Sequence, residues 1–189
     1  MKRLPRGLQS YPQCKAKASI YRNALDHRPL TDGLEGELPT ELVDLIRTPL
    51  LVSTWMETTK AMAVLLAIVD RYEMSDARYY DFIEEMNDAL FRNRVYAALM
   101  SFASPNLLLR AGAARFGAFH QGTTLEVTSS EDNAGIAVMR YPSFLFEPLL
   151  ARGFAVSFRV ALSHSRARGV RVDAEEVTDR CTRFRVSWR

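Results

Sequence analysis

Residues 122–189 read GTTLEVTSSEDNAGIAVMRYPSFLFEPLLARGFAVSFRVALSHSRARGVRVDAEEVTDRCTRFRVSWR, and this stretch decides the fold. At its start, apolar side chains fall on every second residue of 124–128, as on a strand with one buried face. Turn residues follow at 132–135, and the apolar run 136–139 then continues as a more buried strand. The pattern predicts a first β-hairpin.

After this hairpin the spacing of the apolar residues changes. They recur at helical spacing over 148–163, and Gly169 lies just beyond the end of that run. Alternation then returns at 170–174 and at 182–188, on either side of a turn at Thr178-Asp179. The stretch therefore predicts strand, strand, helix, strand, strand. These strands would form a four-stranded antiparallel sheet whose two hairpins are separated by one helix.

The chain before residue 122 has a helical pattern throughout. It predicts five helices, at 13–27, 40–47, 53–73, 75–99 and 104–122. Residues 61–69 are apolar almost all round, which is typical of a helix surrounded by other helices. Ser104 is followed by Pro105, the usual order of a helix cap and a proline in the first turn.

These patterns predict an α+β fold in a single domain. A helical layer occupies 11–121 and the β-β-α-β-β unit occupies 122–189. Residues 1–10, which include Pro5 and Gly7, are expected to form a flexible arm. A length of 189 residues is ordinary for one domain with one core.

Composition indicates a soluble cytoplasmic protein. Hydrophobic residues make up 48% of the chain and charged residues 25%. The longest apolar run, 61–69, is much shorter than the roughly 20 residues of a membrane span. The N-terminus lacks the pattern of a secretory signal. Cys14 and Cys181 lie far apart in the sequence, which favours reduced thiols over a disulfide framework.

No motif in the chain predicts a reaction. A phosphate-binding glycine loop and a nucleophile elbow are both absent from the sequence. The cysteines and histidines show no local spacing of metal ligands, so no metal site is predicted. Glu84 and Glu85 are adjacent and therefore face different directions on a helix, which indicates solvated charge. The sequence predicts a protein that is not an enzyme.

Aromatic residues are concentrated in the C-terminal stretch and are candidates for a ligand pocket, since such pockets are largely apolar with few polar anchors. The candidates are Phe144, Phe146, Phe154, Phe158, Phe184 and Trp188, with Arg159 as a polar anchor. Ordinary core packing is the other explanation for the same residues, and the sequence leaves both open.

Arginines are concentrated around the last hairpin. The group comprises Arg166, Arg168, Arg171, Arg180, Arg183, Arg185 and Arg189. Strand alternation would place Arg183 and Arg185 on one face as a basic stripe. Nucleic-acid binding is disfavoured because no helix-turn-helix or single-strand platform accompanies the charge. Protection of a sheet edge and docking of an acidic partner are the alternatives.

Four segments carry a resemblance to known proteins. They are Ser104-Pro105-Asn106-Leu107-Leu108, residues 115–122, Thr178-Asp179-Arg180-Cys181 and Phe184-Arg185-Val186-Ser187-Trp188. Over roughly residues 40–189 the chain resembles the superfamily of heme nitric-oxide-binding domains, 4-vinyl-reductase-like sensor domains and Golgi-transport tethering subunits. Within it, the chain most resembles an uncharacterised myxobacterial paralogous family. The resemblance implies a pocket between the helical layer and the sheet for a small apolar ligand or cofactor, or a surface for dimerisation.

Two details of the resemblance concern cofactors. The sensor members place metal-binding cysteines near the final hairpin, where this chain has only Cys181. The heme domains hold the propionates with a Tyr-x-Ser-x-Arg signature, of which Tyr141 and Ser143 match, whereas position 145 is leucine. His120 is interpreted as the last residue of a helix, favoured there by the helix dipole, and heme bound at His120 is the alternative. The sequence predicts no cofactor.

The function predicted from these observations is a non-catalytic cytoplasmic regulatory or adaptor module. It would act through protein contacts, as a homodimer or with another protein, and would have room for a small apolar ligand. A dedicated small-molecule sensor domain is the alternative, and nucleic-acid binding through the arginine stripe comes third.

Overall fold

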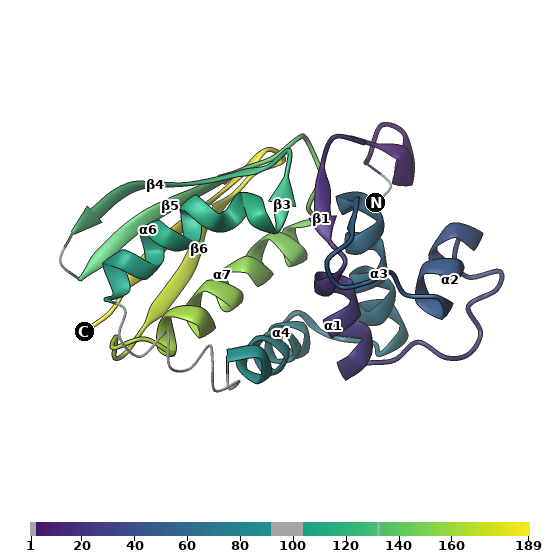
Figure 1. Cartoon of the computed structure of the whole chain (residues 1–189), viewed down its shortest axis with the longest axis horizontal. Coiled ribbons are helices and arrows are strands. Elements are labelled where there is room, and N and C mark those ends of the chain that lie inside the picture. Colours follow the sequence, from purple (N-terminus) through teal and green to yellow (C-terminus); the bar gives the residue numbers. More distant parts are fainter. Residues whose placement is uncertain (1–2, 92–103, 132) are drawn as a thin grey trace.

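The computed structural model describes residues 3–91, 104–131 and 133–189. A four-stranded sheet forms one side of the molecule, and helices cover one face of it (Figure 1). The N-terminal helices gather beyond the end of this sheet, and both parts share one hydrophobic core. The predicted α+β fold is confirmed.

The large sheet has the predicted arrangement. Its strands are β4 (Thr124–Glu131), β5 (Ala134–Arg140), β6 (Arg171–Val177) and β7 (Cys181–Ser187). They are antiparallel in the order β4-β5-β7-β6, so each predicted hairpin is present and β5 joins the two through β7. Ala137 pairs with Phe184 and Met139 with Thr182, and all four are at most 1% exposed. This register puts one continuous apolar face toward the helices.

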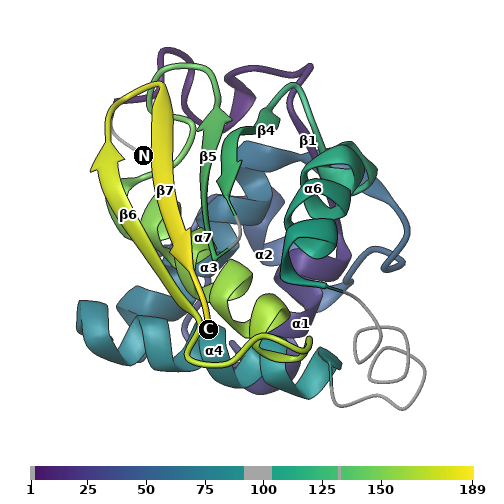
Figure 2. The same ribbon diagram turned by 90° about the vertical axis from the view of Figure 1, so that its left-hand side faces the viewer.

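Two helices cover that face. The helix α7 (Pro148–Ser163) runs between the hairpins, as predicted, and packs on β6 and β7. The helix α6 (Pro105–Arg115) lies beside β4, with α7 behind the sheet (Figure 2). The two helices leave room between them over the sheet, which is where the cavity described below lies.

Five described helices precede the first hairpin, as predicted. They are α1 (Ser19–His27), α2 (Thr40–Arg47), α3 (Thr58–Arg71), α4 (Asp76–Phe91) and α6. The predicted centre of the helical layer is confirmed, because α3 is buried almost all round. The part of the predicted helix 75–99 that extends past Phe91 lies outside the described residues.

A small second sheet is present that the sequence did not predict. Its strands are β1 (Lys15–Lys17), β2 (Trp55–Glu57) and β3 (His120–Gln121), in the order β2-β1-β3. The predicted helix starts at residues 13 and 53 and the predicted helix end at 122 were therefore wrong. Strands of two or three residues are too short to show alternation, and their partners lie far away along the chain.

The segment before β1 packs on α3. A short 3-10 helix spans Gly7–Gln9, and the Thr59 hydroxyl donates a hydrogen bond to the Leu8 carbonyl at 2.6 Å. Leu4 and Ser10 are buried. The division of the chain at residue 10 stays a prediction.

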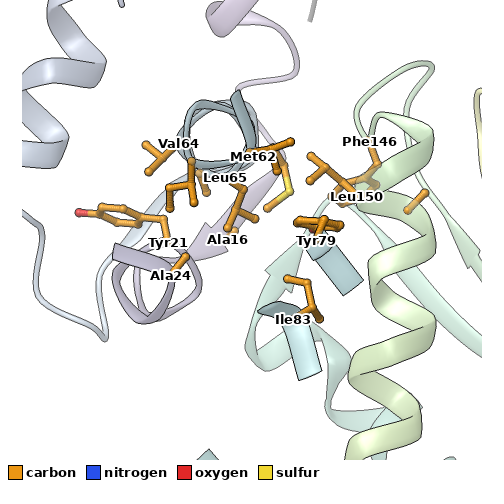
Figure 3. Close-up of a cluster of buried hydrophobic side chains, with 14 of the residues drawn as sticks. Ala16, Tyr21, Ala24, Met62, Val64, Leu65, Tyr79, Ile83, Phe146 and Leu150 are labelled. Carbon is orange, nitrogen blue, oxygen red and sulfur yellow. The ribbon is translucent and has the colours of Figure 1, made fainter. Parts of the chain in front are cut away.

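The two parts of the molecule meet in an apolar cluster (Figure 3). Met62 and Leu65 of α3 lie between Tyr21 of α1 on one side and Tyr79 of α4 on the other. Leu150 of α7 lies next to Tyr79, so this cluster connects the N-terminal helices to the helix that covers the sheet. It also forms the inner wall of the cavity.

The helix α6 begins at the predicted cap. Ser104 has extended backbone, and its hydroxyl accepts a hydrogen bond from the Leu107 amide at 3.2 Å. We expect Ser104→Ala to lower the free energy of unfolding by about 1 kcal/mol, because an amide of the first turn loses its acceptor. Urea unfolding measures this change. Ser104→Asp keeps an acceptor and should stay near the wild type, and equal stability of Ser104→Ala would contradict the role of the cap.

In the part of the chain that is described, no helix has both the length and the apolar character required to cross a membrane.

Candidate functional site

A cavity of about 500 Å³ lies between the helices and the large sheet. Residues from α1, α3, α4, α6, β4, β5 and α7 line it, and most of them are apolar. Its volume falls within the range of roughly 300–1,000 Å³ that is usual for small-molecule sites. The cavity is the candidate functional site.

Small residues on α6 create part of this space. Ala111, Gly112 and Ala113 face a region framed by larger side chains, and a Cβ atom added at Gly112 would meet no heavy atom within 4 Å. On the opposite wall, Gly153 of α7 allows close approach of Tyr79, whose hydroxyl oxygen would lie 3.0 Å from a Cβ atom added at Gly153. Small side chains on two facing helices therefore keep the interior open.

His120 is the distinctive polar residue of the cavity. It lies in β3 opposite Ala16 and is only 5% exposed, with its ring stacked on Phe116 at 4.6 Å between centroids. The ring of Phe154 meets it edge-on at 5.6 Å. Its Nδ1 atom has no hydrogen-bond partner among the described residues. The interpretation of His120 as the end of a helix was wrong, because the helix ends at Arg115 and the chain continues into a strand.

Burial determines the charge of this ring. Removal from water lowers the pKa of His120 to about 4, because the charged form is the one that loses its hydration. At neutral pH the ring is therefore an uncharged imidazole. A neutral imidazole with an unpartnered nitrogen, set in an apolar wall, is suited to bind a metal centre or a hydrogen-bonding ligand.

Two further polar side chains line the cavity. Asn87 of α4 donates to the Ser157 hydroxyl of α7 at 3.2 Å and to the Ile83 carbonyl at 2.7 Å. Tyr79 is 2% exposed, and burial raises the pKa of its hydroxyl, so the phenol stays protonated. These groups can donate or accept hydrogen bonds inside a largely apolar space.

The predicted aromatic candidates divide into two groups. Phe154 and Phe158 line the cavity. Phe184 lies below Phe158, with ring centroids 5.2 Å apart, and packs in the core at 0% exposure. Trp188 is also buried outside the cavity lining. The alternating pattern of β7 marked the inner face of the sheet without distinguishing cavity from core.

Two other candidates lie outside the cavity lining. Arg159 was predicted as the polar anchor of the pocket, but its guanidinium forms a two-point ion pair with Glu84 of α4 at 3.1 and 2.8 Å. The ring of Phe144 lies under the guanidinium of Arg3, 5.6 Å from the ring centroid. Each residue joins separate elements of the fold.

The Tyr-x-Ser segment also lies away from the cavity lining. The Tyr141 hydroxyl donates to the Thr178 carbonyl at 3.2 Å and lies 2.9 Å from the Thr182 hydroxyl. The Ser143 hydroxyl accepts a hydrogen bond from Arg180 Nε at 2.8 Å. A guanidinium is thus present beside Ser143 although position 145 is leucine, and it comes from the turn of the second hairpin.

The arginine stripe is partly neutralised. Arg183 and Arg185 of β7 both pair with Glu175 of β6, and hydrogen bonding to Arg185 lowers the pKa of that carboxyl. The remaining candidates stand elsewhere: Arg171 begins β6, and Arg166 and Arg168 lie in its connection to α7. This charge balance gives no support to nucleic-acid binding, which stays a prediction.

Cysteines do not form a metal site in the described chain. Cys14 is buried, its thiol donates toward the Gly122 carbonyl at 3.4 Å, and burial raises its pKa. Cys181 lies 3.4 Å from the Thr178 hydroxyl. Over residues 3–91, 104–131 and 133–189, no three His, Cys, Asp or Glu side chains gather as a group that could hold a metal ion.

Sequence reasoning missed most of the cavity wall. Tyr79, Asn87 and Arg115 all line it, and each lies on a helix that reads as an ordinary amphipathic helix. The signal that could have indicated the site is the run Ala111-Gly112-Ala113, since consecutive small residues on the inner side of a helix leave space unfilled.

Solved structures share this fold. No family model matches the sequence, and no curated protein matches it. The chain is similar to the Fe(II) unliganded H-NOX protein from K. algicida, at 12% identity and a TM-score of 0.54 over 92% of this chain and 96% of that one. It is similar to the S. oneidensis H-NOX protein in the Fe(II)NO state, at 11% identity and a TM-score of 0.56 over 92% and 99%. A mutant of T. tengcongensis H-NOX gives 6%, 0.54, 90% and 94%.

The fold is therefore that of H-NOX (heme nitric oxide/oxygen binding) domains. This supports the heme-domain part of the resemblance, whereas the myxobacterial, 4-vinyl-reductase and Golgi-tethering parts stay predictions. The likeness favours a small-molecule sensor over the adaptor hypothesis. Adaptor and homodimer functions also stay predictions.

The prediction of no cofactor was wrong, because the solved structures with this fold are H-NOX domains and point to heme. That prediction rested on Leu145 and on a helical position for His120. The structure supplies a guanidinium beside Ser143 from Arg180, and it buries His120 in the wall of a cavity.

Proposed function

We propose that the chain is a small-molecule sensor domain that binds heme in its cavity, with His120 as the axial ligand. The observation that carries the proposal is the neutral, buried His120 ring, which lines an apolar cavity and has an unpartnered nitrogen. The similarity of fold to H-NOX proteins supports the same assignment.

The residues present fit such a cofactor. An imidazole binds iron through a lone pair, which requires the neutral ring that burial maintains here. Phe116 and Phe154 contact the ring from two directions and fix its orientation without occupying its nitrogens. Apolar walls exclude water from the space beside it.

When bound, heme supplies an iron with a coordination position for a small gas molecule. The chain's own contribution is to hold the imidazole neutral and oriented and to keep the surroundings apolar. Asn87, Ser157 and Tyr79 offer hydrogen-bonding groups in the same cavity. Tyr141 and Ser143 do not line it, so anchoring of the carboxylates must differ from the Tyr-x-Ser-x-Arg arrangement.

Heme reconstitution of the purified protein tests this proposal. We expect a Soret band with the wild type and its loss or a large shift in His120→Ala, because no other histidine lines the described cavity. His27→Ala is the matched control, since His27 lies on α1 outside the lining, where its Nδ1 contacts the Asn23 carbonyl at 2.8 Å. Absence of a Soret band in the wild type, or an unchanged spectrum in His120→Ala, would remove the assignment.

A further inference from the structure

One residue provides the formal charge of the cavity. Among its described lining residues, Arg115 is the only one that is charged at neutral pH, because His120 is neutral and no acid is present. A cavity with apolar walls and a single cation favours a ligand with an apolar body and one acidic group.

Arg115 also lacks an internal counter-charge. None of the described acids lies within ion-pair distance of it, whereas Arg159 of α7 is paired with Glu84. An arginine presents its donors in a planar fork that matches the two oxygens of a carboxylate. Arg115 is therefore free to bind an anionic group of a ligand.

The position of Arg115 indicates which end of the ligand it would bind. It is the last residue of α6 and is exposed, as is Phe119, which is 54% exposed and also lines the cavity. Ser19 and Asn23 of α1 line this accessible part and are partly buried. The buried apolar residues of α3 and α7 line the other end. The acidic group would stay near water while the apolar body enters the cavity.

We infer that the ligand of this cavity is an amphipathic carboxylate whose acid group is bound by Arg115 at the mouth. The inference rests on the proposed function in that it concerns the same cavity. Two sources share this chemistry, namely the carboxylates of a porphyrin and a long-chain fatty acid. Arg115 would act by binding the carboxylate directly in either case.

Matched pairs of probes test the inference. Binding of heme is compared with binding of its dimethyl ester, and binding of a long-chain fatty acid with that of the alcohol of equal length. We expect Arg115→Gln to weaken the acids about fivefold or more, as loss of an accessible charge pair would, and to leave the ester and the alcohol unchanged. Added salt should weaken only the acids.

Arg110→Gln is the matched control. Arg110 is an exposed arginine of the same helix, but it lines a separate surface hollow with Val127, Thr128 and Ser129 and not the cavity. It should bind all four probes as the wild type does. Circular dichroism checks that both variants are folded.

Each outcome separates the two proposals. If heme gives a Soret band that depends on His120 but acid and ester bind equally, the inference about Arg115 fails and the sensor proposal stands. If the fatty acid binds in an Arg115-dependent way and heme does not, heme is the wrong ligand and Arg115 keeps its role. If none of the four probes binds, both fail.

Discussion

Lowering the pH of the heme-free protein from 7 to 4 is expected to remove about 3 kcal/mol of folding stability through His120 alone. The pKa of the buried ring is about 4, compared with 6.5 for an ordinary histidine. Between these values the unfolded chain binds a proton that the folded chain does not. Stability from this residue is therefore complete above pH 6.5 and declines as the pH falls toward 4.

Urea unfolding of the wild type and of His120→Phe measures this effect. Phenylalanine keeps an aromatic ring beside Phe116 but does not titrate. The difference in unfolding free energy between the two proteins should change by about 3 kcal/mol between pH 7 and 4. It should stay constant between pH 7 and 8, where the histidine is neutral in both states. A constant difference over the whole range would show that the ring is not desolvated.

The large sheet could be predicted because its signals are local. Residues 124–128 and 182–188 alternate over enough positions to distinguish a strand from a helix, and the turn residues between the strands set the hairpins. Likewise, Ser104 and Pro105 mark the start of α6 through contacts that span three residues. Patterns of this kind do not depend on distant parts of the chain.

The site could not be predicted in the same way, because it depends on contacts distant in sequence. His120 belongs to a two-residue strand whose partner is Ala16, and only this pairing removes it from the helix pattern of α6. The cavity arises where α6 and α7 pass over the sheet, so Phe158 lines it while Phe184, on the neighbouring strand, packs below. Sequence spacing identified both rings as inward-facing and could go no further.

Gly122→Ala is expected to cost about 3 kcal/mol or more of folding stability. The backbone φ angle of Gly122 is +72°, a conformation that strains any residue with a Cβ atom. An added Cβ would also lie 2.7 Å from the Cys14 sulfur and 3.0 Å from both Cys14 Cα and the Gln13 carbonyl oxygen. Two of these three contacts are with backbone atoms, which cannot rotate away as a side chain can.

This glycine matters for the site because it follows β3 directly. It lies two residues after His120 and holds the end of β3 against the chain that enters β1. We therefore expect Gly122→Ala to weaken heme binding as well as stability, since a displaced β3 moves the imidazole away from Phe116. Loss of stability without loss of binding would mean that β3 adjusts independently of Gly122.

Gly117→Ala provides the matched control for this substitution. Gly117 lies five residues earlier, its φ angle is not positive, and a Cβ added there would meet no heavy atom within 4 Å. Its unfolding free energy should stay within about 0.5 kcal/mol of the wild type. The double variant Cys14→Ala with Gly122→Ala removes the sulfur contact but keeps the backbone contacts and the positive φ, so it should recover only part of the loss. Equal stability of Gly122→Ala and Gly117→Ala would show that the close approach of β1 to Gly122 is not a constraint on the fold.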